Sequence, residues 1–346
     1  MIDDLVSAIP ALDEQAAARA QARIDAKTKP RGSLGRLEEL YCRLAAMTGR
    51  TPPEHGTKTI VVMAGDHGVA EEGVSAYPQE VTAQMLLNFA AGGAAVNQLA
   101  RVVGARLLVV DMGTVRPTGV AGVREVRIGA GTRNFTREAA MTREASEHAI
   151  RAGAAIADEL ARAGVGLIGL GEMGIGNSTS ASALTAALTG LAPEEVTGRG
   201  TGVDDAGWQR KVTAIQRGLD LHRGGDALDT LARLGGFEIA GLCGVVLGAA
   251  ARRVPVVVDG FTATCGAAYA ARVAPRAAGY LLPSHRSVEV GHRALLSALR
   301  LEPLFDLGMR LGEGTGAALA MTIIDAAVAL DGMATFAEAQ VSDTGR

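Results

Sequence analysis

Short runs of apolar and largely β-branched residues recur through the middle of the chain, and helix-length stretches separate them. Near-continuous apolar strands that alternate with helices are typical of a parallel sheet covered on both faces. The pattern therefore predicts an α/β fold, with strands at residues 59–65, 107–113, 165–171, 254–260 and 278–284.

The two ends of the chain have a helical pattern instead. Residues 11–27 are rich in alanine, and residues 36–48 place leucine and methionine side chains on one stripe. Residues 315–330 form a long apolar segment that also favours a helix. We expect a large α/β domain over 56–299 and a small helical domain built from 1–55 and 300–346.

Polar residues stand at the end of each predicted strand. In open parallel sheets the ligand crevice lies outside the carboxyl ends of the strands, so side chains collected there can bind or deprotonate a substrate. The alternative is that each of them only caps the helix that follows. The residues concerned are Asp66 and His67, Asp111, Glu172, Asp259, and Ser284 with His285.

The composition narrows the class of protein. Of 346 residues 48% are hydrophobic, 3% are aromatic and 45 are glycine, and the net charge is −3. This apolar content argues against disorder, and a slightly acidic chain with few aromatic rings is unsuited to stacking on nucleic acid. We therefore expect small-molecule substrates and no nucleic-acid partner.

Cysteine usage and the apolar runs favour a cytoplasmic protein. The three cysteines are far apart and form no CxxC pair, and the first ten residues lack the pattern of a secretory signal. The longest apolar runs, 239–251 and 317–324, are shorter than the roughly 20 residues that a membrane-spanning helix needs. We expect no membrane span.

The richest candidate motif is GLGEMGIGNSTSASAL at 169–184, which contains a G-x-G-x-x-G sequence. A dinucleotide site also needs a second strand that ends in an acidic residue about 20 positions later, and residues 189–202 contain no such strand. A glycine turn at a helix N-terminus instead favours a mononucleotide phosphate, bound by backbone N–H groups of the turn together with Asn177, Ser178 and Thr179. An ordinary capped turn is the other possibility.

A second glycine loop, GRGTG at 198–202, precedes a segment that contains Lys211. Together with Arg199, this lysine supplies cations that can complete a phosphate site. The adjacent Asp204 and Asp205 are more typical of a helix start than of a magnesium site. No HExxH or HxxxH pattern occurs, so we expect no metal and no cofactor.

The third glycine loop, LGEGTG at 311–316, places Glu313 between two glycines. In an apolar pocket the pKa of this carboxyl would rise toward the value that a general base needs. The alternative is a turn whose glutamate only begins the following helix. A further segment, VVVDGFTATCG at 256–266, is superficially similar to the phosphoribosyl-diphosphate loop of magnesium-dependent phosphoribosyltransferases, but Gly260 occupies the second acidic place.

Taken together, seven segments resemble the nicotinate-nucleotide–dimethylbenzimidazole phosphoribosyltransferase family over nearly the whole chain. They are KPRGSLGRLE (29–38), GDHGVAEEGVSAYPQEVTAQM (65–85), GEMGIGNSTSASAL (171–184), GRGTGVDDAG (198–207), DGFTATCGAA (259–268), SHRSVEVGHR (284–293) and LGEGTGAALAM (311–321). The resemblance implies a Rossmann-like large domain, a small helical domain and a homodimer. It also implies transfer of phosphoribose from nicotinate mononucleotide to 5,6-dimethylbenzimidazole, which yields α-ribazole 5′-phosphate and nicotinate in cobalamin assembly.

The resemblance also implies roles for single residues. Glu313 matches the catalytic glutamate and Glu172 a second active-site acid. Gln84 and Leu311 match positions that line the benzimidazole pocket. The phosphate is assigned to Gly174, Asn177, Ser178, Gly200 and Lys211, with serine at 178 where threonine is expected. Two other functions stay open, a nucleotide-dependent oxidoreductase and a non-catalytic protein that binds a nucleotide or base.

Overall fold

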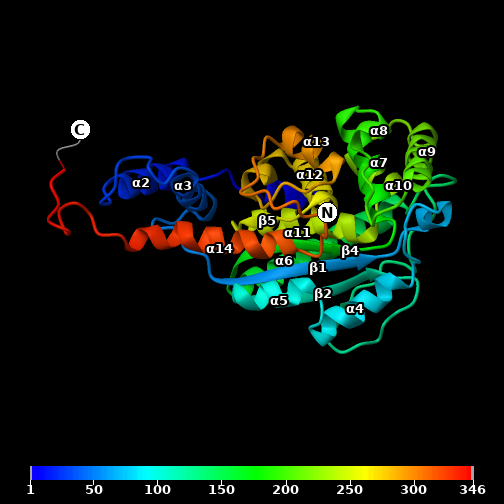
Figure 1. Ribbon diagram of the computed structural model, residues 1–346, viewed down its shortest axis with the longest axis horizontal. Helices are drawn as coiled ribbons and strands as arrows, with labels where there is room; N and C mark the ends of the chain where they lie inside the picture. Colours follow the sequence, from blue (N-terminus) through cyan, green and yellow to red (C-terminus); the bar gives the residue numbers. More distant parts are fainter. Residues whose placement is uncertain (1, 344–346) are drawn as a thin grey trace.

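The computed structural model describes residues 2–343 and contains one sheet of six parallel strands (Figure 1). The strand order is β3-β2-β1-β4-β5-β6, so the direction of winding reverses between β1 and β4, and a crevice opens at the carboxyl ends there. The strands are β1 (Thr57–Gly65), β2 (Ala105–Gly113), β3 (Val123–Glu125), β4 (Val165–Met173), β5 (Val256–Val258) and β6 (Leu281–Pro283).

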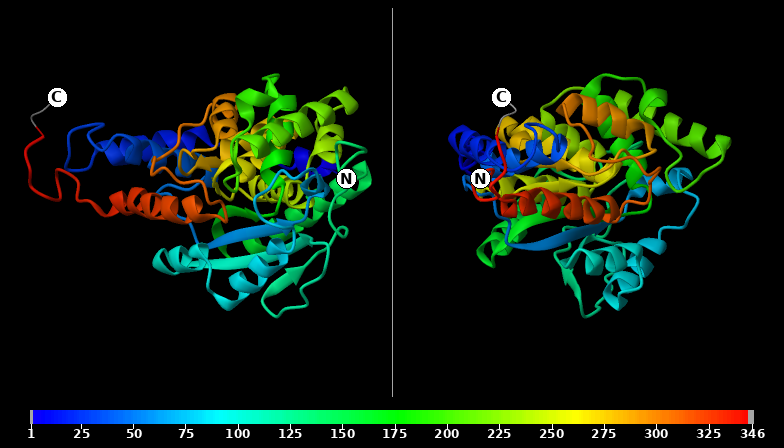
Figure 2. Two further views of the ribbon diagram at one scale, coloured as in Figure 1. Left: turned by 45° about the vertical axis from the view of Figure 1, so that its right-hand side comes forward. Right: turned by 60° about the vertical axis from the view of Figure 1, so that its left-hand side comes forward.

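Helices cover both faces of this sheet. α4, α5 and α14 lie on one face, whereas α6, α11 and α12 lie on the other (Figures 1 and 2). The α-helices of residues 2–343 are α1 (Ile2–Ser7), α2 (Glu14–Asp25), α3 (Arg36–Thr48), α4 (Val81–Ala91), α5 (Ala95–Val102), α6 (Arg143–Arg162), α7 (Asn177–Thr189), α8 (Pro193–Val196), α9 (Asp205–Leu221), α10 (Ala227–Leu234), α11 (Phe237–Ala251), α12 (Phe261–Val273), α13 (Val290–Leu299) and α14 (Thr315–Ala329). Three 3₁₀ helices are η1 (Gly68–Glu72), η2 (Pro275–Tyr280) and η3 (Leu330–Gly332).

Small residues let the helices approach the central strands closely. A Cβ atom at Gly169 of β4 would lie 3.0 Å from the Met321 side chain of α14. On the opposite face, a Cβ atom at Gly241 of α11 would lie 2.6 Å from the Met63 sulfur of β1. Both faces of β1 and β4 are therefore sealed, which explains the uninterrupted apolar sequence of these strands.

The helices at the two chain ends pack against each other, as the sequence predicts. α2 contacts α3, and α14 runs from β4 and β5 to α3 (Figures 1 and 2). Polar contacts join the N-terminal segment to the residues that follow α14. Lys27 donates to the Met333 carbonyl at 2.7 Å, and the Tyr41 hydroxyl donates to Asp331 at 2.6 Å. The division into two domains stays a prediction.

The strands and end helices lie where the sequence pattern predicts them. The length of the apolar segment near residue 317 needs correction, because it is longer than the run at 317–324. The short edge strand β3 was not expected, because its three residues carry no apolar run. Residues Thr315–Gly332, which comprise α14 and η3, are long and apolar enough to cross a membrane by length and composition alone. The core helix of a globular protein meets the same test, and the first half of α14 is buried against β4 and β5.

Candidate functional site

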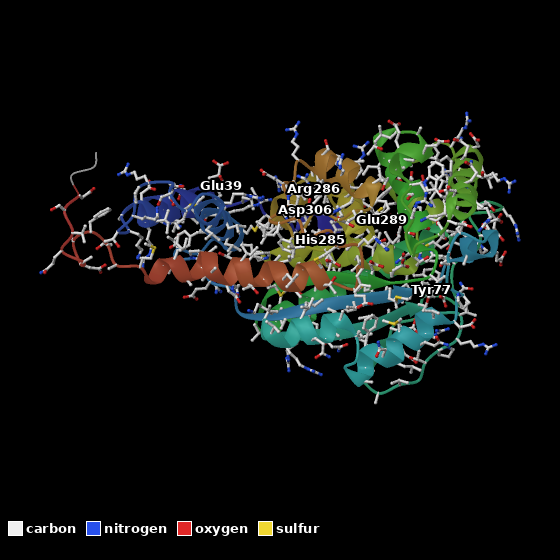
Figure 3. The ribbon with its side chains drawn as sticks, in the orientation of Figure 1. Glu39, Tyr77, His285, Arg286, Glu289 and Asp306 are labelled. Atoms are coloured by element: carbon white, nitrogen blue, oxygen red, sulfur yellow. The ribbon has the colours of Figure 1, made fainter. Side chains whose placement is uncertain are left out.

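A cavity of about 570 Å³ opens at the carboxyl ends of the strands, beside the point where the strand order reverses. It lies between the β4–α7 turn, the start of α12, the 198–202 loop and the segment before α14. Its lining comprises Tyr77, Glu172, Met173, Gly174, Ile175, Asn177, Ser178, Gly200, Thr201, Gly260, Phe261, Thr262, Ser287, Glu289, Arg310, Leu311 and Gly312. Figure 3 labels two of these lining residues, Tyr77 and Glu289.

The G-x-G-x-x-G sequence does not form a dinucleotide loop. Gly169 and Gly171 lie inside β4, where they allow close packing, and only Gly174 belongs to the turn before α7. A Cβ atom at Gly171 would lie 2.5 Å from the Glu313 carbonyl oxygen. Gly171 therefore serves the packing of the 311–316 loop and Gly169 that of α14. Gly174 of the turn lines the cavity, which is consistent with the prediction that this turn belongs to a binding site.

One wall of the cavity holds a buried cation. Lys211 of α9 is fully buried, and its Nζ atom donates to the Ser178 hydroxyl at 3.0 Å. Burial lowers the pKa of this lysine to about 8, although the nearby Glu289 carboxylate raises it. Lys211 stands behind Ser178 rather than in the cavity lining, so any effect on a ligand there would pass through this hydroxyl or require a small movement.

The 198–202 loop closes the same wall around Gly200. Its N–H donates to Glu289 Oε1 at 2.9 Å, and its carbonyl accepts from the Arg310 guanidinium at 3.2 Å. A Cβ atom at Gly200 would lie 2.6 Å from the Ser178 hydroxyl, so only glycine fits. Arg199, by contrast, turns away and pairs with Asp205, so this arginine does not supply the cation that the sequence suggested.

Glu172, near the end of β4, lies against Gly312, on the side of the cavity formed by the 311–316 loop. Its Oε2 atom accepts a hydrogen bond from the Asn177 side chain, and a Cβ atom at Gly312 would lie 2.3 Å from its Oε1 atom. Burial raises the pKa of Glu172 to about 8, with a further contribution from the negative charge of Asp259. This carboxyl therefore binds a proton near neutral pH and can donate or accept a hydrogen bond.

Glu313 lies directly behind the Gly312 wall and is 6% exposed. Its Oε2 atom is buried and has no hydrogen-bond partner. Burial raises the pKa of Glu313 to about 7, the Asp259 charge adds to this effect, and the Val96 backbone N–H opposes it. The sequence-based expectation of a raised pKa therefore agrees with its surroundings, and the free oxygen can accept a proton.

The other polar residues at the strand ends serve mainly as structural acceptors. Asp66 accepts from the Val115 N–H at 2.8 Å, and Asp111 accepts from the Gly113 and Thr114 N–H groups at 2.9 and 2.8 Å. His67 contacts Glu238 at 2.6 Å beneath the β4–α7 turn. These two aspartates therefore hold the loops at the sheet edge, and neither of these bonds caps the helix that follows its strand.

Six of the nine predicted site residues line the cavity: Glu172, Gly174, Asn177, Ser178, Gly200 and Leu311. Glu313 and Lys211 stand immediately behind it. Gln84 is an exposed residue of α4 and does not line this cavity. In residues 2–343 no group of three or more histidine, cysteine, aspartate or glutamate side chains could hold a metal ion.

The polar lining residues that the sequence reasoning missed include Tyr77, Glu289 and Arg310. Tyr77 and Glu289 lie in two of the seven recognised segments, and Arg310 immediately precedes a third. Because each stands in a loop without strand or helix periodicity, its position in a motif was the only available signal.

Comparisons with known proteins agree with this arrangement. A family model described as phosphoribosyltransferase matches residues 9–341. The nicotinate-nucleotide–dimethylbenzimidazole phosphoribosyltransferase of Roseiflexus sp. (strain RS-1) is 54% identical over 99% of this chain and 98% of its own length. The enzyme of the same name from Geobacter sp. (strain M21) is 51% identical, over 99% of both chains. The crystal structure of CobT from Thermus thermophilus superposes with a TM-score of 0.92 at 47% identity, covering 95% of this chain and 99% of that one.

Proposed function

Because this chain belongs to the nicotinate-nucleotide–dimethylbenzimidazole phosphoribosyltransferase family, we propose that it transfers phosphoribose from nicotinate mononucleotide to 5,6-dimethylbenzimidazole. The products are nicotinate and α-ribazole 5′-phosphate, the nucleotide that carries the lower ligand of cobalamin. The activity is that of a pentosyltransferase.

The observation that carries this proposal is the pairing of an anion site with a proton acceptor across one cavity. On one wall Ser178, backed by Lys211, and the N-terminus of α7 offer donors to a phosphate group. Behind the other wall Glu313 holds an unpaired carboxylate oxygen. We assign the phosphate to Gly174, Asn177, Ser178, Gly200 and Lys211, and the acceptor base to the Glu313 side of the cavity.

The reaction needs one proton acceptor. The bond between C1′ of the ribose and the pyridinium nitrogen breaks, and its electron pair neutralises that nitrogen, so the leaving group requires no acid. One ring nitrogen of the benzimidazole forms the new bond to C1′, and the other loses its proton. Glu313 accepts that proton, and a pKa of about 7 suits this role at neutral pH.

Attack from the face opposite the leaving group converts the β-linkage into an α-linkage. The acceptor must therefore lie on the other side of the ribose from the departing nicotinate. Glu172 projects between the phosphate wall and the 311–316 loop, and it is suited to position the ribose or the acceptor. Leu311 supplies apolar contact for the flat acceptor ring. Gln84 is assigned to the acceptor pocket from the family motif alone.

A direct assay tests the function. Purified protein is mixed with nicotinate mononucleotide and dimethylbenzimidazole in the presence of a metal chelator, and both products are separated by chromatography. We expect nicotinate and α-ribazole 5′-phosphate to appear in equal amounts. Nicotinate release that does not depend on dimethylbenzimidazole would instead indicate hydrolysis, and the absence of both products would refute the proposal.

We also propose that the protein is a homodimer located in the cytoplasm. Two large apolar side chains that line the cavity, Tyr77 and Leu311, are more than half exposed, and so are Val288, Val290 and Leu307 in the segments that carry the lining residues Glu289 and Arg310. Exposed apolar patches of this kind are typical of surfaces that another protein covers. Light scattering on the purified chain would give twice the monomer mass of 35.4 kDa if the dimer forms.

A further inference from the structure

Asp259 caps α14 from a different part of the fold. It follows β5 and is 1% exposed, and its Oδ2 atom accepts the Gly314 N–H at 2.8 Å. Its Oδ1 atom accepts the N–H groups of Gly316 at 2.7 Å and Ala317 at 3.2 Å. Gly314 occupies the N-cap position and has no side chain of its own to satisfy these donors.

The segment that Asp259 holds contains Glu313 in a strained conformation. Glu313 has a φ of 63°, between Gly312 at 83° and Gly314 at 89°. A residue with a Cβ atom in this left-handed region is strained and persists only where its surroundings enforce it. The hydrogen bonds from Gly314, Gly316 and Ala317 to Asp259 begin directly after Glu313 and supply that constraint.

Asp259 also adds a buried negative charge close to both candidate acids. The Asp259 charge is the largest electrostatic influence from a neighbouring group on both Glu313 and Glu172. Burial raises the pKa of Asp259 itself to about 6, so it is largely ionised at neutral pH. Within residues 2–343 no lysine or arginine lies within ion-pair distance of these three carboxyls.

The remaining groups that face this cluster come from β6, α5 and α11. His285, after β6, lies 3.7 Å from Asp259 Oδ1, and burial lowers its pKa to about 4, so it is neutral. The Val96 N–H of α5 faces Glu313, and the Glu238 charge of α11 acts on Glu172. None of these groups neutralises Asp259.

From these contacts we propose that Asp259 is a positioning residue for phosphoribosyl transfer, which fixes the turn that carries Glu313 and places a buried carboxylate close to it. The inference rests on the proposed function, in which Glu313 takes the acceptor's proton. It also gives a role to the DGFT segment that differs from the phosphoribosyl-diphosphate loop it superficially resembles. Both carboxylate oxygens of Asp259 are engaged by backbone N–H groups, so they do not bind a ribose.

The test compares two substitutions that separate charge from position. Asp259→Asn keeps the shape and removes the charge, whereas Asp259→Glu keeps the charge and moves the carboxylate by one methylene group. Nicotinate release is measured between pH 5 and 9, and the KM for nicotinate mononucleotide is measured at each pH. Thermal unfolding and circular dichroism show whether each variant is folded.

In Asp259→Asn we expect kcat to fall about 10- to 100-fold, because the loop carrying Glu313 is misplaced. The acid limb of the pH profile, where kcat/KM falls as the pH decreases, should also move about one pH unit lower. The reason is that a neighbouring negative charge no longer raises the pKa of Glu313. In Asp259→Glu we expect a similar fall in kcat with the acid limb at its wild-type position. The KM for the mononucleotide should change less than about twofold in both, because the phosphate wall does not include Asp259.

Asp111→Asn serves as the matched control, since Asp111 is also buried and also accepts loop N–H groups at the end of a strand. This variant should lose stability and keep the wild-type acid limb. If Asp259→Asn is folded and keeps the wild-type rate and acid limb, the inference is wrong. If only Asp259→Glu folds, an unchanged kcat in that variant contradicts it equally. A wild-type protein that forms no products would instead overturn the proposed function itself.

Discussion

Lys211 and Ser178 form a buried contact across two helices, with the ammonium group of α9 donating to the hydroxyl at the start of α7 over 3.0 Å. No carboxylate of residues 2–343 lies within ion-pair distance of this ammonium, and burying a charge costs free energy unless a nearby group compensates it. Its lowered pKa, about 8, reflects that cost. A bound phosphate in front of Ser178 would supply the missing negative charge.

Lys211→Met tests this interpretation, because methionine keeps much of the length and removes the charge. We expect the KM for nicotinate mononucleotide to rise about 10- to 100-fold, the usual effect of losing one charge-assisted contact. The value of kcat should fall less, because the lysine is remote from Glu313. Steady-state kinetics with saturating dimethylbenzimidazole give both constants.

Arg217→Met is a suitable control on the same helix, since Arg217 is exposed and reaches only Glu72. It should have wild-type constants. An unchanged KM in Lys211→Met would remove Lys211 from the phosphate site and leave the α7 N-terminus as the main anion contact.

The central sheet was predictable from the sequence because buried parallel strands need continuous apolar runs, and those runs stand out at 59–65 and 165–171. The presence of Asn177 and Ser178 in the cavity lining was also predictable, since both follow a glycine turn at a helix start, whereas phosphate binding there stays a prediction. The two-residue spacing of Gly169 and Gly171 was misleading. These glycines look like part of a nucleotide loop, but they lie in β4, where Gly169 admits side chains of α14 and Gly171 admits the backbone at Glu313.

The contacts around Asp259 could not be predicted from the sequence. Asp259 and Gly314 are 55 residues apart, and nothing in either segment specifies that the carboxylate of one caps the helix that follows the other. The same limit applies to Glu289 and Gly200, which meet across 89 residues. Such pairs depend on how the loops fold over the sheet edge, which local periodicity does not encode.

Replacing Glu313 with glutamine should leave the fold intact and reduce turnover by roughly 10²–10⁴, the usual scale for a positioned general base. Glutamine has nearly the same shape but cannot take the acceptor's proton. Glu302→Gln, at an exposed position in the preceding segment, should have full activity. Wild-type turnover in Glu313→Gln would show that another group is the base.

The rate of the wild-type protein should depend on pH with a midpoint near 7. The base must be ionised to accept a proton, and the pKa of Glu313 is raised to about 7. The value of kcat/KM should therefore fall about tenfold per pH unit below this midpoint and level off above it. A profile that is flat from pH 5 to 8 would contradict an ionising base with this pKa.

Two glycine-to-alanine substitutions test the contact between Gly312 and Glu172. Gly312 and Gly308 both have positive φ values, 83° and 65°, so an alanine at either position carries a similar backbone strain. At Gly312 the added Cβ would lie 2.3 Å from Glu172 Oε1, whereas at Gly308 it meets no atom within 4 Å. We expect Gly312→Ala to lower kcat at least about tenfold and Gly308→Ala to remain close to wild type. Equal effects on kcat would mean that backbone strain, and not displacement of Glu172, is responsible.

The raised pKa of Glu172 should also appear in the stability of the protein. In the folded state this carboxyl keeps its proton up to a pKa of about 8, whereas in the unfolded chain it ionises near 4.5. The folded state therefore binds more protons between these values, and the contribution of Glu172 to the free energy of unfolding declines as the pH rises through that window. Glu172→Gln lacks this titration, so its stability relative to wild type should increase by on the order of 2 kcal/mol between pH 5 and pH 8. Urea unfolding of both proteins at several pH values measures the difference, with Glu302→Gln as the exposed control. A stability difference that does not change with pH would mean that Glu172 is ionised throughout this range.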